Sequence, residues 1–357
     1  MDDLFSTFEH EATEAEAKQA VKTFSGSYLS VFVYLVFVGL LAFFTQIGVL
    51  FIFGLHDGYY IISSPYFTYA IQVIILYILG FPILWLMNRK IPRISLERKK
   101  LGFGNFLSYF LIGIFAMQAG AYISSLLSSR LGELFPNSEL ETDSVQSFIN
   151  DTPIWLIFLV VVVIGPIFEE LMFRRILLDR LSLYGNRLAI TVTSVTFGLF
   201  HGNLEQLVYA TALGFVLGIV YIESGNIKYS IALHCLINLF GTFPSLLLQY
   251  FEGQLNILLD SGSESVGLTL LYSVASALLT IFILGLALAG LIIFIVRAVR
   301  GAFMPKRDCT VRLSGYTLAK CVILNLGCAL FLIYSFAQIF NSGLYDALFD
   351  IFEPYLK

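Results

Sequence analysis

Residues 154–175 read IWLIFLVVVVIGPIFEELMFRR, an apolar run that ends in the paired carboxylates Glu169 and Glu170 and then in two arginines. An ionisable residue at the edge of a membrane segment costs a few kcal/mol or more, so it marks a functional site that has a partner. The chain has only four histidines, and His201 and His234 lie in later apolar segments. They are therefore the candidate partners of the two carboxylates.

The composition predicts an all-α protein, a polytopic bundle of transmembrane helices. The 357 residues are 58% hydrophobic and 13% charged, with a mean hydropathy of +0.83. About nine apolar stretches are long enough to cross a hydrocarbon layer of ~30 Å. The predicted spans are residues 27–54, 67–87, 105–129, 154–171, 187–203, 205–222, 229–250, 267–296 and 317–340.

The distribution of lysine and arginine predicts the orientation. If the N-terminus is cytoplasmic, nearly all of the 21 basic residues fall on the cytoplasmic side, as the positive-inside rule requires. With nine spans the C-terminus is then extracytoplasmic, and the expected location is the plasma membrane. The net charge of −4 gives no sign of nucleic-acid binding.

Helical spacing separates the roles of the two glutamates. Glu170 and Arg174 are four residues apart and share a helix face, where a carboxylate that precedes a cation pairs favourably. Glu169 has Phe173 at the same interval and therefore no cation. Glu170 is predicted to be the structural partner and Glu169 the free base.

The same spacing recurs around the two histidines. Phe197 precedes His201 by four residues, so its ring can pack beside the imidazole. His234 precedes Asn238 by four residues, so an imidazole and an amide face the same region of space.

These residue types suit peptide-bond hydrolysis. A carboxylate can take a proton from water while a histidine orients the same water. A second histidine and an amide can donate to the oxyanion, each donor typically contributing ~2.7–4 kcal/mol. As an alternative, Glu169, His201 and His234 form a His₂Glu set for a catalytic Zn²⁺, as in a metalloprotease. The metal-independent route is favoured because the chain has no HExxH pair, and each ligand would come from a different span.

The three motifs, EExxxR, FxxxH and HxxxN, occur in this order on successive membrane helices and resemble the CPBP family of intramembrane proteases. The abbreviation stands for CAAX protease and bacteriocin-processing, and the family is also called Abi. It includes the type II CAAX prenyl endopeptidases. The resemblance covers about residues 154–245. It implies that Glu169 and His201 activate water and that His234 and Asn238 hold the oxyanion. The supporting residues that it implies are Glu170, Arg174 and Phe197.

The expected organisation follows from the motif positions. A cytoplasmic segment precedes three membrane helices, a catalytic core and two further helices. In residue numbers these parts are 1–26, 27–153, 154–250 and 251–357. The expected partners are the lipid bilayer and a protein or peptide substrate, without nucleic acid.

Two other classes of protein compete with the protease. A secondary transporter usually has two related halves, each with a broken helix, whereas here the buried ionisable groups form one cluster. A non-catalytic binding or immunity protein of the same fold should have lost at least one of the four catalytic positions, and none is lost.

Overall fold

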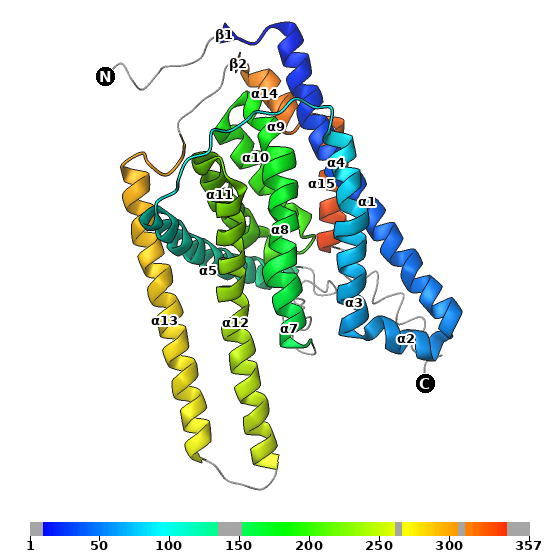
Figure 1. Ribbon diagram of the computed structural model, residues 1–357, viewed down its shortest axis with the longest axis vertical. Coiled ribbons are helices and arrows are strands. Elements are labelled where there is room, and N and C mark those ends of the chain that lie inside the picture. Colours follow the sequence, from blue (N-terminus) through cyan, green and yellow to red (C-terminus); the bar gives the residue numbers. More distant parts are fainter. Residues whose placement is uncertain (1–9, 135–151, 261–265, 306–310, 341–357) are drawn as a thin grey trace.

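The computed structural model describes residues 10–134, 152–260, 266–305 and 311–340. The predicted all-α class is confirmed for this part of the chain, in which nearly every element is a helix (Figure 1). The α-helices are α1 (Glu14–Phe53), α2 (Leu55–Ser63), α3 (Pro65–Gln72), α4 (Phe81–Asn88), α5 (Phe103–Leu134), α7 (Ile154–Ile157), α8 (Gly165–Glu170), α9 (Asp179–Leu181), α10 (Asn186–Phe200), α11 (Leu204–Ser224), α12 (Ile227–Asp260), α13 (Val266–Val299), α14 (Gly315–Val322) and α15 (Leu326–Phe340).

Three stretches are wound as π-helix and continue directly into α-helices. They are η2 (Val73–Gly80), η3 (Phe158–Ile164) and η4 (Leu171–Leu178), and a short 3₁₀ turn, η5 (Ser182–Tyr184), follows α9. The two-residue strands β1 (His10–Glu11) and β2 (Val311–Arg312) pair in parallel. Because π-helical turns displace the usual backbone hydrogen bonds, they often occur at functional sites.

Within the described residues, six helices are long and apolar enough to cross a membrane, so the chain is a multi-pass membrane protein. They are Glu14–Phe53, Pro65–Asn88, Phe103–Leu131, Ile154–Tyr184, Leu204–Ser224 and Thr269–Val299. Helices α14 and α15 are bent by 45° and would make a seventh span if they cross together.

The predicted count of about nine spans is not confirmed. The predicted span 187–203 corresponds to α10, which has 15 residues and rises only ~22 Å at ~1.5 Å per residue. The predicted span 229–250 lies inside α12, which is not among the candidates within the described residues. The predicted segments 1–26 and 251–357 lie partly outside the described residues.

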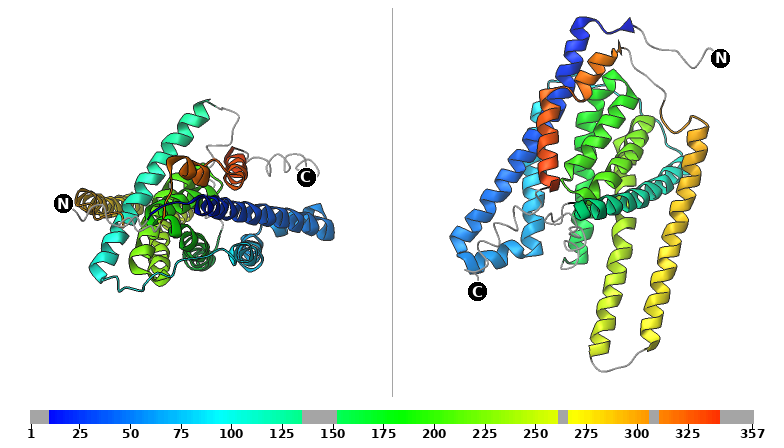
Figure 2. Two further views of the ribbon diagram at one scale, coloured as in Figure 1. Left: turned by 90° about the horizontal axis from the view of Figure 1, so that it is seen from above. Right: turned by 180° about the vertical axis from the view of Figure 1, so that it is seen from behind.

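The helices that hold the motifs lie in the middle of the molecule. Figure 1 shows α8 and α10 at the centre, with α1, α3 and α4 on one side and α12 and α13 on the other, and the view from behind in Figure 2 agrees. The flanking helices expose apolar side chains, among them Phe51 on α1 and Ile281 on α13. Such faces suit contact with lipid tails, which are as apolar as leucine.

The turn after α10 sets the position of one predicted catalytic histidine. Helix α10 ends at Phe200 with His201 as its C-cap. Gly202 follows with a φ of 66°, which glycine adopts without steric cost. Asn203 then caps α11 by accepting a hydrogen bond from the Gln206 backbone. The chain therefore reverses directly after His201.

Candidate active site

Glu170 is the centre of a buried polar cluster. Its side chain and that of Arg174 are both 0% exposed, and Arg174 Nε donates to Glu170 Oε2 at 3.2 Å. The other carboxylate oxygen, Oε1, lies 3.2 Å from His234 Nδ1. The predicted pairing of Glu170 with Arg174 is thus present, and Glu170 also joins α8 to α12.

Arg174 and the two histidines meet at the ring of Phe197. The Arg174 guanidinium lies 5.4 Å from the ring centroid, an arrangement in which the aromatic face attracts the cation. The same ring packs at 4.9 Å from His201 and 5.8 Å from His234, both edge to face. The predicted packing of Phe197 beside His201 is confirmed, and Phe197 forms one wall of the site.

Glu169 is placed differently from its neighbour. Its side chain is 17% exposed, and its Oε2 lies 3.6 Å from His234 Nε2. His234 therefore has a carboxylate at each ring nitrogen. Because a carboxylate only accepts, His234 donates to Glu170 through Nδ1, and it donates through Nε2 as well only as the imidazolium.

His201 presents one nitrogen to the site. Its Nδ1 lies 2.8 Å from the Phe197 carbonyl oxygen, which can only accept, so Nδ1 carries the proton. The neutral ring then keeps an unprotonated Nε2. Glu169 and His234 are near enough for their charges to act on this ring.

Asn238 has a contact that the sequence does not reveal. Its Nδ2 donates to the Val161 carbonyl oxygen at 2.9 Å, which ties α12 to the π-helical segment η3. A side-chain amide has two N–H groups. One of them is used in this tie.

The described side chains do not fit the zinc alternative. Among these residues, no three His, Cys, Asp or Glu side chains are arranged so that they could hold a metal ion. Of the proposed ligands Glu169, His201 and His234, only the first and the last make a close contact with each other. The chemistry below therefore contains no step through a metal.

Besides Tyr209, two tyrosines from outside residues 154–245 lie near Glu169 and were not among the predicted site residues. The Tyr77 ring stacks on Phe168 with the ring centroids 4.7 Å apart, and the Tyr34 hydroxyl donates to the Leu76 carbonyl at 3.1 Å. A tyrosine buried in an apolar segment usually needs a partner for its hydroxyl. Tyrosines within the apolar stretches 27–54 and 67–87 were the signal that could have identified them.

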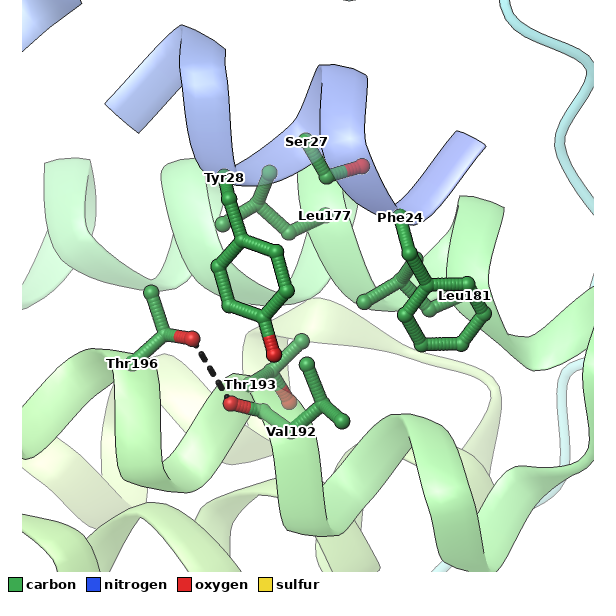
Figure 3. A pocket seen from close by; sticks show the side chains of 8 residues that line it. All are labelled: Phe24, Ser27, Tyr28, Leu177, Leu181, Val192, Thr193 and Thr196. Carbon is green, nitrogen blue, oxygen red and sulfur yellow. Dashed lines mark hydrogen bonds between the residues drawn. The ribbon is translucent and has the colours of Figure 1, made fainter. Parts of the chain in front are cut away.

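A small cavity lies elsewhere in the bundle, between α1, the η4–α9 segment and α10 (Figure 3). Its volume is about 10 Å³, roughly the room for one water molecule. In Figure 3 the Thr196 hydroxyl bonds the Val192 carbonyl at 2.8 Å. None of the predicted catalytic residues lines this cavity, so it is a packing gap. Its lining residues are Phe24, Ser27, Tyr28, Leu177, Leu181, Val192, Thr193 and Thr196.

Comparison with known proteins finds a family similarity over part of the chain. The model for Rce1-like type II CAAX prenyl endopeptidases matches residues 151–240. The putative membrane peptidase YdiL of Bacillus subtilis is 26% identical over 196 residues, which are 54% of this chain and 79% of YdiL. The membrane-embedded CAAX protease MroQ of Staphylococcus aureus is 26% identical over 148 residues, 40% of this chain and 57% of MroQ. No solved structure matches.

The matched segment holds all three motifs and the side chains that meet around Glu170. The resemblance drawn from the motifs is thus confirmed by an independent comparison. Over residues 151–240 the chain is similar to the Rce1-like type II CAAX prenyl endopeptidases, the CPBP family of membrane proteases, and it is similar as well to two bacterial membrane peptidases.

Proposed function

We propose that this protein is an intramembrane endopeptidase that hydrolyses a peptide bond of a membrane-associated protein or peptide, with Glu169 as the general base. The observation that carries the proposal is the contrast between two adjacent carboxylates. Glu170 is fully buried and paired with Arg174, whereas Glu169 is partly exposed beside His234. A carboxylate that has no arginine partner and lies within reach of solvent can accept a proton from water.

The first half of the reaction forms a tetrahedral intermediate. Glu169 takes one proton of a water molecule, and His201 Nε2 accepts a hydrogen bond from the other. The water oxygen bonds to the carbonyl carbon, and the electron pair of the C=O π bond moves to the oxygen. His234, as the imidazolium, and the second N–H of Asn238 donate to this oxyanion, and such donors act more strongly on the transition state than on the substrate.

In the second half, the oxyanion reforms the carbonyl and the C–N bond breaks. The proton held by Glu169 passes to the leaving nitrogen, which departs as an amine. Glu169 is then a carboxylate again, and the products are a new carboxyl terminus and a new amino terminus. Glu170 and Arg174 touch no reacting atom in this scheme. They hold His234 in orientation through its Nδ1.

A comparison of membrane proteomes tests the proposal. Cells that produce the wild-type chain are compared with cells that produce Glu169→Gln at the same level. Peptides with new termini should accumulate only with the wild type. Identical sets of termini in the two samples would contradict the proposal, and the sequences at the lost termini would define the substrate class.

We also propose a cytoplasmic N-terminus and about nine crossings, with α10 and α12 inside the membrane. The loop 89–102 between α4 and α5 carries six exposed basic residues, Arg89, Lys90, Arg93, Arg98, Lys99 and Lys100. Its backbone bonds Asp179 at the start of α9 and Ser224 at the end of α11. These three places therefore lie at one face of the molecule, and the positive charge favours the cytoplasm.

This orientation predicts the side of the C-terminus. Seven or nine spans are both odd numbers, so the C-terminus should be extracytoplasmic, whereas six spans would return it to the cytoplasm. A reporter enzyme fused after Lys357 should be active only when it functions outside the cytoplasm. A reporter inserted in the loop 89–102 should behave in the opposite way. A fusion at Lys357 that works only in the cytoplasm would contradict the prediction.

Asn238→Ala should lower kcat by about 10²–10³ and leave KM nearly unchanged, because an oxyanion donor acts mainly in the transition state. Single-turnover kinetics on the purified full chain measure this effect. Thermal unfolding of the same sample reports the separate loss of the bond to Val161. If KM rises while kcat is unchanged, Asn238 binds substrate and does not hold the oxyanion.

The zinc alternative predicts a different result for the purified protein. A bound catalytic zinc would appear as about one metal ion per chain, and a variant that lacks a ligand would lose it. Elemental analysis of the wild type and His234→Ala therefore separates the two routes. If the wild type contains one zinc per chain and His234→Ala contains none, the metal-independent mechanism is wrong.

A further inference from the structure

Two tyrosines from outside the family-matched residues 151–240 face the Glu169 carboxylate. Its charge acts on the hydroxyls of both Tyr34 and Tyr77. The Tyr34 hydroxyl is already bonded to the Leu76 carbonyl. The Tyr77 hydroxyl makes no hydrogen bond to a protein group within the described part of the chain. This hydroxyl is not one of the fully enclosed polar atoms of the described residues, so a group from outside the protein can reach it.

Gly165 keeps open a space between the Tyr77 hydroxyl and Glu169. A Cβ atom at residue 165 would lie 3.3 Å from Tyr77 Oη and 3.7 Å from Glu169 Oε1. Both oxygens therefore border the same point, the one that a side chain at this position would fill. A small group that lies between these two oxygens, beside Gly165, can contact the phenol and the carboxylate together.

The Tyr77 ring is held rigidly in this place. Tyr77 is 6% exposed, and its ring lies nearly parallel to that of Phe168, at 16°. Phe168 directly precedes Glu169, so one turn of helix fixes both the phenol and the carboxylate. A donor that is already in position costs no reorganisation when charge develops in the transition state.

We propose that Tyr77 is a catalytic residue whose hydroxyl donates a hydrogen bond to the scissile carbonyl oxygen as that oxygen becomes negative. Tyr77 then acts beside His234 as an oxyanion donor, supplied by the N-terminal helices. The inference rests on the proposed peptidase function and assigns part of the chemistry to η2. Tyr34, in contrast, donates its hydroxyl to the Leu76 backbone carbonyl.

The test compares Tyr77→Phe with the wild type in the full-length purified protein. The probe is a synthetic peptide that spans a cleavage site lost in Glu169→Gln membranes. Removing the hydroxyl leaves the ring in place, so kcat should fall on the order of 10²-fold while KM stays nearly unchanged. Tyr34→Phe is the matched control, since it loses a structural bond and should lower the unfolding temperature without this loss of kcat.

Gly165→Ala gives a second and independent measurement. The added methyl group lies 3.3 Å from Tyr77 Oη and 3.1 Å from the Val160 carbonyl oxygen. We expect kcat to fall, and thermal unfolding of the same sample checks that the protein remains folded. When Gly165→Ala is combined with Tyr77→Phe, the double variant should lose little more kcat than Tyr77→Phe alone, because both changes remove the same contact.

Three outcomes would overturn the inference. The first is a Tyr77→Phe enzyme with the wild-type kcat per folded molecule, while Glu169→Gln is inactive. The second is an equal loss of kcat in Tyr34→Phe. The third is the absence of any Glu169-dependent cleavage by the wild type, which would also remove the proposed function and is therefore distinguishable from the other two.

Discussion

Glu169→Gln is expected to abolish cleavage while the protein still accumulates to the wild-type level. The amide cannot take the proton of the attacking water, and loss of a general base typically costs 10²–10⁴-fold in rate. The side chain is partly exposed and its ionic partner is His234 at 3.6 Å. His234 keeps its second carboxylate, Glu170, when Glu169 is made neutral, so the replacement leaves no buried charge unpaired. Initial rates on a defined peptide and immunoblots of the membrane fraction measure the two effects separately.

Glu170→Gln is the matched control for this variant, because it makes the same chemical change one residue further along. It leaves Arg174 buried beside an amide and weakens the contact with His234. Its abundance should therefore fall. If the two variants lose abundance equally, or if Glu169→Gln retains activity, the division of roles between the two carboxylates is wrong.

Arg174→Ala is expected to have the largest effect on stability. Its partner Glu170 is 0% exposed, and removing one member of a buried ion pair typically costs about 3–5 kcal/mol. The cation also lies over Phe197, so the packing of the site wall is lost as well. Thermal unfolding in detergent should show a large decrease in the melting temperature, and the amount of protein in membranes should fall.

A double variant separates the charge from the packing. When both partners are replaced, no buried charge is left unpaired, and such replacements are often close to neutral. The double variant Glu170→Gln with Arg174→Met should therefore be more stable than Arg174→Ala alone, although it lacks the Glu170 carboxylate that contacts His234. If the double variant loses the sum of the two single effects, the pair contributes no coupling energy, contrary to the structure.

Local spacing predicted the contacts that lie within one helix. Glu170 with Arg174 and Phe197 with His201 are each four residues apart, and the geometry of a helix alone brings such residues together. The contact between His234 and Glu170 was not predicted in the same way. It joins residues 64 positions apart, and sequence spacing carries no information about which of two adjacent carboxylates a distant helix will meet.

The span count shows a second limit. Hydropathy cannot distinguish a helix that crosses the membrane from one that is packed inside the protein, because both are apolar. Helix α10 has only 15 residues, and ten of them are buried, with Ile190 and Phe197 almost fully buried. The π-helical segments are equally invisible in the sequence, so the freed Val161 carbonyl that receives Asn238 could not have been foreseen.

The order in which the active-site side chains occur along the chain has a consequence for biosynthesis. Tyr77 and Glu169 belong to helices that leave the ribosome before His201, and His234 follows only with α12. A nascent chain inserted as far as η4 holds its carboxylates without either imidazole, so it has no means to orient water or neutralise an oxyanion. In the proposed mechanism, peptidase activity therefore begins only after α12 has docked, so an incompletely inserted chain cannot cleave neighbouring nascent membrane proteins.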